Sequence, residues 1–354
     1  MTEKTGRVVG GAVLSHVDEC ADAFERVAAL IDAAKTIAIC SHVNPDGDAL
    51  GSGLALAQVI RAHWEGKRVT NLLAEDDVVP RIYRFLPGAD DFVRACAYDE
   101  SPDLFISVDL NMPSRLGDGE AVLARATHTA ILDHHPGDEV VADALIVRPE
   151  AAAAGVIVTE FAEWLGVEVT KDMAQNLFCA ITTDTGRFQY QNADAEAFEV
   201  ASFLVDHGAS PSEVSLNVYQ SFRLAFLHLK SAVMGRITTF ERGRIAYSYA
   251  TQADLMRTGA SLDESDGLVD VVRSVEGSEV ALFLKEVPGG KVRGNLRSKT
   301  GRDISGVARA LGGGGHRAAS GFTIEGTVDD ALSAALPLLQ ALFAEPDSER
   351  CDAS

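Results

Sequence analysis

The first part of the chain alternates short apolar runs with stretches of helical periodicity. An amphipathic helix is predicted from about Val17 to Ala34. Apolar runs that predict strands follow at 36–43, 68–75, 103–110 and 129–135. Further helices are predicted over 49–63, 153–165, 172–182 and 195–206. Strands that alternate with helices are typical of an α/β domain with a mainly parallel sheet, which is the fold class that we expect.

The pattern changes after Gly208 and Pro211, where turn residues predict the end of this first domain. A helix is expected over 221–234, a hairpin over 237–250 and a helix over 268–277, and two strands within 280–299 turn at Pro288-Gly289-Gly290. A helix, a glycine-rich loop, a short strand and a last helix complete a smaller α/β domain. We predict a first domain over 1–218, a helical connector over 219–235, a second domain over 236–345 and a disordered tail over 346–354.

Composition and charge narrow the class of protein. A chain of 354 residues with 47% hydrophobic residues can bury two cores. No apolar run approaches the ~18 residues of a membrane-spanning helix, so we expect a cytoplasmic protein with no membrane partner. The formal net charge of -21 argues against binding of long nucleic acid. Between residues 280 and 320, however, eight basic residues face only two acids, which suggests either a local phosphate site or a solvated charged surface.

The five cysteines are scattered singly and form no CxxC pair. Such spacing suits neither a zinc cage nor a disulfide framework, so we expect reduced thiols.

Four segments place acids or imidazoles where an apolar stretch ends. The residues concerned are His42, Asp46 and Asp48, then Asp109, then Asp133, His134 and His135, and finally Asp184. Any one of these ends could be a helix cap or a hydrogen-bonded core group, but four in one domain favour a metal site. Imidazole nitrogen mixed with carboxylate oxygen suits a borderline divalent ion such as manganese. Gly47, Gly51 and Gly53 are interpreted as residues that let the adjoining loop turn sharply and let another group approach the start of the helix.

The order HVNPDGDALGS, VDL, DHH and TDTGRF resembles the four motifs of the DHH phosphoesterases over residues 36–190. By this resemblance His42 and Asp46 hold one manganese ion, Asp48, His134 and Asp184 hold a second, and Asp109 bridges both. The resemblance also implies that His135 faces the substrate phosphate and that Asp133 orients the histidines, and Arg187 is counted among the catalytic residues. Two such ions activate a water for hydrolysis of a phosphate ester, so no Ser-His-Asp triad is proposed.

In the second domain, GGGGH at 312–316 resembles a motif of the DHHA1 domain, and this similarity spans residues 236–343. Glycine runs are commonly flexible turns, but they also expose backbone N–H groups to an anion. The resemblance implies that the terminal nucleotide is bound by Arg297, Ser298, Gly313, Gly314, Gly315 and His316.

The compact two-domain layout resembles DHH enzymes of the NrnA type. This resemblance implies hydrolysis of short oligoribonucleotides (nanoRNA) and of 3'-phosphoadenosine 5'-phosphate. A linear or cyclic dinucleotide phosphodiesterase is the first alternative, and a catalytically silent nucleotide sensor or an RNA-binding module represents other classes. The expected partner is a short nucleotide substrate and not a long nucleic acid. Magnesium or cobalt in place of manganese, the cleavage polarity, and a monomer or homodimer all stay open.

Overall fold

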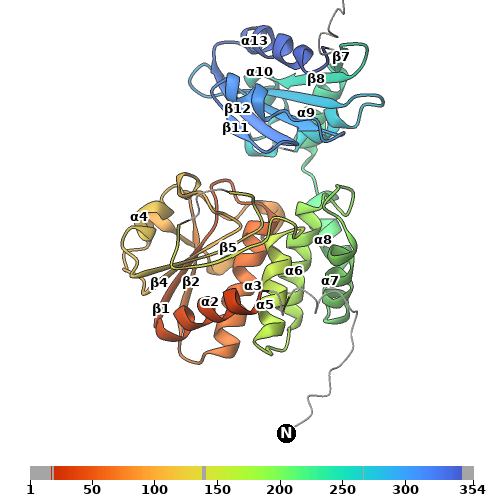
Figure 1. The fold of residues 1–354 in the computed structure, drawn as a ribbon. Coiled ribbons are helices and arrows are strands. Elements are labelled where there is room, and N and C mark those ends of the chain that lie inside the picture. Colours follow the sequence, from red (N-terminus) through yellow and green to blue (C-terminus); the bar gives the residue numbers. More distant parts are fainter. Residues whose placement is uncertain (1–16, 18–19, 138–140, 266, 345–354) are drawn as a thin grey trace, which may run out of the picture. The chain divides into compact units, whose positions relative to one another are not determined.

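The computed structural model describes residues 17, 20–137, 141–265 and 267–344. The chain divides into two compact units, residues 1–221 and 222–354 (Figure 1). The tail predicted over 346–354 lies outside the described residues.

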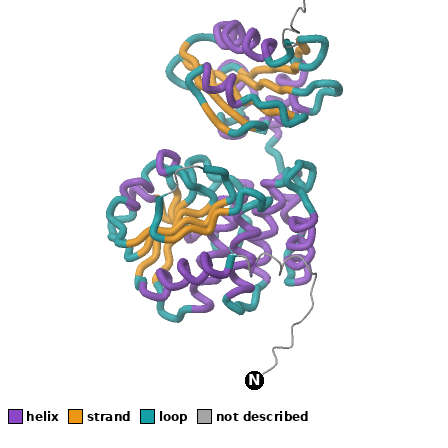
Figure 2. Tube along the Cα trace, in the orientation of Figure 1, coloured by secondary structure: helices purple, strands orange, loops and turns teal. Residues whose placement is uncertain are grey.

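The first unit is built on a six-stranded parallel sheet, which confirms the expected fold class (Figure 2). The strands, in the order β3-β2-β1-β4-β5-β6, are Val93–Arg94, Arg68–Leu73, Thr36–Cys40, Leu104–Val108, His128–Asp133 and Ala144–Val147. Strands β3 and β6 were not predicted. Strand β4 is buried along its whole length, because both faces of a parallel sheet are covered. The chain runs outward in both directions from β1 and β4, and ligands bind such sheets at the carboxyl ends of these strands.

Helices cover the two faces of this sheet unequally. One face packs against α2 (Ala21–Ala33), α3 (Gly47–His63) and α5 (Ala154–Trp164). Helix α6 (Lys171–Asp184) packs against α3 and α5, and α7 (Ala195–Asp206) packs against α6. The other face carries α4 (Gly119–Leu123) and short turns. The remaining short elements are α8 (Pro211–Val214), the π-helical turn Ser215–Tyr219 and 3-10 turns at Arg81–Tyr83, Ala89–Asp91, Ala95–Ala97 and Pro113–Arg115.

The glycines of α3 do not form the sharp turn that we predicted, but two of them do allow a close approach near the start of the helix. Gly47, Gly51 and Gly53 all lie inside the helix and not in a turn. A Cβ atom on Gly47 would lie 2.5 Å from Thr183 Oγ1, and one on Gly51 would lie 2.4 Å from the carbonyl oxygen of Asn176. Their role is therefore to let α3 approach α6 closely. That approach brings the beginning of α3 next to the end of α6.

The second unit has a mixed six-stranded sheet in the order β11-β12-β10-β9-β8-β7, parallel only between β8 and β9 among the described strands. In that order the strands are Gly314–Gly315, Ala319–Glu325, Lys291–Ser298, Val280–Val287, Ile245–Ala250 and Thr238–Phe240. Helices α12 (Ser305–Ala310) and α13 (Val328–Ala341) pack on one face. Helices α9 (Leu224–Gly235), α10 (Gln252–Thr258) and α11 (Leu268–Arg273) pack on the other, and a 3-10 turn spans Asp263–Ser265.

Helix α9, which we predicted as a connector, contributes Phe226, Leu229 and Val233 to the core of the second unit. Part of the predicted glycine loop is strand β11, and α10 was not predicted. No helix among the described residues is both long and apolar enough to cross a membrane. Four of the cysteines lie in the described part of the chain, and all four are free.

Candidate metal centre

The carboxyl edge of the first sheet gathers the predicted metal ligands. Asp109 directly follows β4, and Asp133 is the last residue of β5. Asp46 is the N-cap of α3, so Asp48 lies in the first turn of that helix. Asp184 is the last residue of α6, which the glycines of α3 allow to approach closely.

The first group of potential ligands consists of His42, Asp46 and Asp109, whose ligand atoms all lie within 4.8 Å of one another. Nε2 of His42 lies 3.4 Å from Oδ2 of Asp109. Nδ1 of His42 donates to the carbonyl oxygen of Val43 at 2.9 Å, which directs Nε2 into the group. Oδ1 of Asp46 accepts the first N–H groups of α3, at 3.0 and 3.1 Å. His42 and Asp46 are thus oriented by their own neighbours in the sequence, and His42 also faces Asp109.

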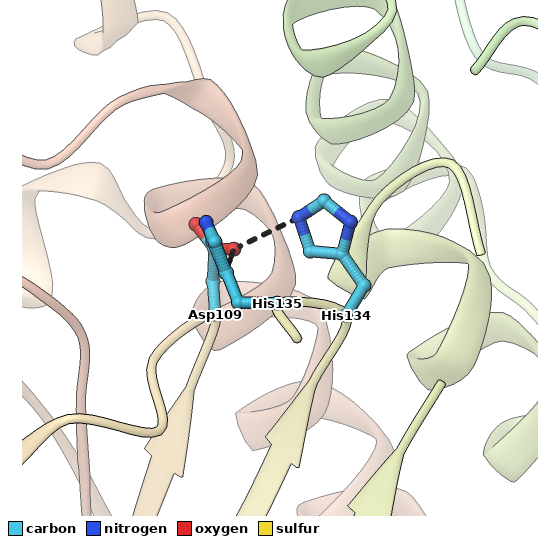
Figure 3. A group of neighbouring side chains, drawn as sticks. All are labelled: Asp109, His134 and His135. Carbon is cyan, nitrogen blue, oxygen red and sulfur yellow. Dashed lines mark ion pairs between the residues drawn. The ribbon is translucent and has the colours of Figure 1, made fainter. Parts of the chain in front are cut away.

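The second group consists of Asp48, His134 and Asp184, again with ligand atoms within 4.8 Å. Nε2 of His134 lies 3.6 Å from Asp48 Oδ2 and 3.7 Å from Asp184 Oδ2. It also lies 3.3 Å from Oδ1 of Asp109, as the dashed line in Figure 3 marks. Asp109 therefore faces a histidine of each group with a different carboxylate oxygen. This is the arrangement expected of a carboxylate shared by two ions.

Asp109 adopts a backbone conformation that non-glycine residues rarely use. Its φ angle of 58° lies in the left-handed region, and its N–H group donates to the carbonyl oxygen of Leu132 at 3.0 Å. Such a conformation costs roughly 1 kcal/mol or more, and it clusters at functional sites. The turn places the carboxylate at the strand edge, between the two groups.

Asp133 supports the two histidines that follow it. It is fully buried, and its Oδ1 accepts from Nδ1 of His135 at 2.8 Å and from the N–H group of His134 at 2.8 Å. The side-chain amide of Asn111 donates to the carbonyl oxygen of His135 at 2.8 Å. Ring orientation and loop position at the DHH tripeptide are thereby both fixed.

The pKa values of the ligand residues reflect the concentration of carboxylates in the two groups. Burial lowers the pKa of both histidines, but Asp109 and the other carboxylates outweigh it, so the pKa of His42 is about 9 and that of His134 about 11. Burial and the charge of Asp109 raise the pKa of Asp48 to about 7, and burial raises that of Asp184. Burial opposes ionisation of Asp109, yet His134 and His42 hold its pKa below the usual range. The cluster therefore favours cations, whether protons or metal ions.

The residues fit a pair of divalent ions. Oδ1 of Asp109 and Nε2 of His134 are buried and face each other at 3.3 Å, but neither makes a well-formed hydrogen bond among the described residues. Buried polar atoms without such a bond are costly unless a ligand compensates. Carboxylate oxygens combined with imidazole nitrogens suit manganese, iron, cobalt or zinc, so the donor set alone does not fix the metal.

Arg187 is the remaining residue of the first unit that we predicted to be catalytic. It lies with Gly186 and Phe188 in a run of three residues with φ between 56° and 63°. Its guanidinium lies over the ring of Tyr219, 4.8 Å from the centroid. No ion pair joins it to the metal-group carboxylates within the described ranges, so its catalytic role stays a prediction.

In the second unit, strand β12 links the two halves of the predicted nucleotide site. Arg297 pairs with Ala319 on one side of β12, and Gly315 pairs with Ser320 on the other. The N–H group of Ser298 donates to Ala318 O at 2.8 Å, in the turn that begins at His316. The glycines allow close strand contact, because a Cβ atom on Gly313 would lie 2.1 Å from a backbone oxygen of β12.

Several supporting residues had not been singled out from the sequence. Asn111 contacts His135, and Asn192 contacts Asp184. The backbone of the alanine run at 151–154 contacts His134 and Asp48. The asparagines follow no periodic pattern that would have distinguished them. The alanine run did carry one signal, since α5 begins at an alanine with no side-chain cap. Because this helix start is also buried, its N–H groups need a partner other than water.

Comparison with known proteins adds an independent line of observation. Residues 36–181 match the N-terminal domain of the DHH family, and residues 243–345 match the DHHA1 domain. The chain is 31% identical over 296 residues to the bifunctional oligoribonuclease and PAP phosphatase NrnA of Thermus thermophilus, covering 82% of this chain and 84% of that protein. It is 26% identical over 300 residues to the cyclic-di-AMP phosphodiesterase GdpP of Geobacillus thermodenitrificans, covering 81% of this chain and 44% of that one.

The fold has a solved counterpart of nearly equal extent. The crystal structure of an exopolyphosphatase-related protein from Bacteroides fragilis superimposes with a TM-score of 0.83 at 25% identity. The match covers 94% of this chain and 98% of that chain. The fold of nearly the whole chain is therefore shared with a solved structure.

Proposed function

Because the chain belongs to the DHH family, we propose that it is a metal-dependent phosphoesterase that hydrolyses short oligoribonucleotides to mononucleotides and 3'-phosphoadenosine 5'-phosphate to AMP. One observation carries the reaction type. Two groups of ligand residues share the buried Asp109, which faces His42 with one oxygen and His134 with the other. The similarity to NrnA supports the choice of substrates.

We assign one ion to His42, Asp46 and Asp109 and the other to Asp48, His134, Asp184 and the same Asp109. When bound there, two divalent ions, which we propose to be manganese, would activate a water and neutralise charge at the phosphate. The protein fixes the ligands in place and holds His135 through Asp133, at 2.8 Å. We assign Nε2 of His135 to the substrate phosphate, since Nδ1 is engaged by Asp133.

Substrate binding is assigned to the second unit. Arg297 supplies a cation, and Ser298, Gly313, Gly314, Gly315 and His316 supply hydroxyl, backbone and imidazole contacts for the terminal nucleotide. The net charge of -21 favours substrates of a few nucleotides, because a longer phosphate backbone would meet an acidic surface.

Arg297→Ala is expected to raise KM about tenfold or more with little change in kcat, as loss of one charge-assisted contact does. Lys291→Ala, on the same strand but distant from the glycine run, serves as its control.

A second candidate function is hydrolysis of linear or cyclic dinucleotides. Similarity to GdpP over 81% of this chain favours it. The same two-metal chemistry would serve, so only the substrate differs.

The test is a product time course with Mn²⁺ on four substrates: a dinucleotide, a five-residue RNA, a cyclic dinucleotide and 3'-phosphoadenosine 5'-phosphate. Asp109→Asn is the inactive control. Metal-dependent release of mononucleotides from RNA and of phosphate from the bisphosphate is the expected result. Preference for the cyclic dinucleotide would support the second function. Absence of turnover on all four would refute both and favour a nucleotide sensor.

A further inference from the structure

Residues 151–155, here called the alanine loop, form a buried segment that leads into α5. Ala151, Ala152, Ala153 and Ala154 are between 0% and 3% exposed. Backbone polar groups in a buried loop need partners, because water cannot reach them. In the alanine loop, several of these partners belong to the second metal group.

Asp48 is the partner of the first two N–H groups of α5. Ala154 N donates to Asp48 Oδ2 at 2.7 Å, and Gly155 N donates to Oδ1 at 3.0 Å. Ser52 Oγ donates to the same Oδ1 at 2.7 Å. The carboxylate of Asp48 thus replaces the missing side-chain cap at Ala153, and its plane is fixed by three donors.

His134 is oriented by the beginning of the same loop. Its Nδ1 donates to the carbonyl oxygen of Ala151 at 3.1 Å. This bond places the proton on Nδ1 and directs Nε2 towards Asp48 and Asp184. Backbone partners of this kind set the tautomer of a metal-binding histidine.

Asn192 joins the alanine loop to the third member of the group. Its side-chain amide nitrogen donates to Ala152 O at 3.0 Å. The same nitrogen lies 3.2 Å from Asp184 O and 3.4 Å from Asp184 Oδ2. Asn192 therefore links the loop that orients Asp48 and His134 to the end of α6, which carries Asp184.

We propose that the alanine loop and Asn192 form a positioning shell for the second ion, and that Asn192 is a positioning residue for that ion alone. The inference rests on the proposed metal-dependent function. The first group has separate support, since His42 is oriented by Val43 and Asp46 by the start of α3. Among the described residues, Asn192 makes no hydrogen bond to that group.

The experiment compares Asn192→Leu, which keeps the size of the side chain but removes the donor, with the full wild-type chain. Mn²⁺ binding is measured by calorimetry and by the electron paramagnetic resonance signal of free Mn²⁺. We expect affinity for one ion to fall about 10- to 100-fold while affinity for the other is unchanged. Asn217→Leu is the matched control, because within the described part of the chain its amide donates only to Glu213 O, at 2.9 Å, on another part of the first unit. Asn192→Gln, which retains an amide donor, is expected to recover part of the lost affinity.

The outcomes separate this inference from the proposed function. Wild type that binds no Mn²⁺ would refute the proposed function. Wild type that binds two ions, with Asn192→Leu binding both equally well, would overturn the positioning shell alone. Equal weakening of both ions would also overturn it, because the shell would then lack selectivity. Circular dichroism checks the fold of each variant without metal, and Asn192→Ala replaces the leucine variant if that one is misfolded.

Discussion

The two metal groups of the first unit differ in how they are held. In the first group, His42 and Asp46 lie in one short segment and are oriented by Val43 and by the N–H groups that begin α3. In the second, Asp48 accepts from residues 106 and 107 positions away in the sequence. One half of the centre is therefore a local motif, and the other half depends on tertiary structure. We expect the second half to be the more sensitive to distant changes.

Asp109→Asn should weaken metal binding at both groups, since His42 and His134 both face this carboxylate. Asparagine tolerates the left-handed backbone that Asp109 adopts, so the fold should persist. We expect kcat/KM for hydrolysis to fall at least about 10³-fold, or ~4 kcal/mol of transition-state stabilisation. Steady-state kinetics with Mn²⁺ measures it. Asp143→Asn, a carboxylate paired with His128 at the opposite end of β5, is the control that should retain activity.

Protonation should distinguish the two histidines in the metal-free protein. Their pKa values of about 9 for His42 and about 11 for His134 both exceed the ordinary 6.5. A raised pKa means that the folded chain binds the proton more tightly than the unfolded chain does. The stability that each provides is therefore complete below pH 6.5 and is lost as the pH rises through about 9 for His42 and about 11 for His134. For His42 the loss is at most ~3 kcal/mol.

Nitrogen NMR of the imidazole rings, recorded against pH without metal, tests this order. The expected titration midpoints differ, with that of His42 the lower. Midpoints near 6.5 for both rings would contradict the electrostatic account. Urea unfolding between pH 6.5 and 9 checks the accompanying fall in stability.

Gly51→Ala should disturb the approach of α3 to α6, which brings members of both groups together. The new Cβ atom would lie 2.4 Å from the carbonyl oxygen of Asn176, and a backbone atom cannot move aside cheaply. We expect a loss of about 1–3 kcal/mol in the free energy of unfolding, with lower turnover. Gly53→Ala is the control two residues along α3, where the nearest atom, Asn71 Oδ1, would be at 3.5 Å. That variant should gain up to about 1 kcal/mol from helix propensity, and equal effects of the two changes would refute the explanation.

Asp46→Asn should have the smallest effect on stability, because the first group is locally supported. Asparagine is as good an N-cap as aspartate, so its side-chain oxygen can still accept from the start of α3. We expect the free energy of unfolding to change by less than about 0.5 kcal/mol, while affinity for the first ion falls. Denaturation and Mn²⁺ titration of the same sample measure both quantities. Asp46→Ala, which removes the cap, should cost about 1 kcal/mol more.

The sequence predicted the parallel sheet and the ligand candidates because their signals are local. Strands β1, β4 and β5 are mostly apolar runs that end in, or are closely followed by, acidic or histidine residues. Strand β3 has two residues and β6 has four, too few to show a period. The assignment of ions to residues is still a prediction, as is the role of Arg187.

The supporting contacts could not be predicted, because they join residues far apart in the chain through backbone atoms. Asn192 and Asn111 are ordinary polar residues until the fold places them beside Ala152 and His135. The role of Gly51 likewise depends on a helix more than one hundred residues later. A sequence pattern indicates the chemistry of a residue and of its near neighbours, whereas these roles depend on which distant residue the fold places in contact with it.

The contacts of the alanine loop restrict the mutations that the gene can tolerate in this segment. Four identical small residues look like a repeat whose length can vary. Their burial already excludes larger side chains, since these would overpack the interior. Deletion or duplication of one alanine codon, however, would shift the following backbone by ~3.8 Å. Ala151 O and Ala154 N could not then both meet His134 and Asp48. In this segment a functional gene must keep the number of residues as well as their small size.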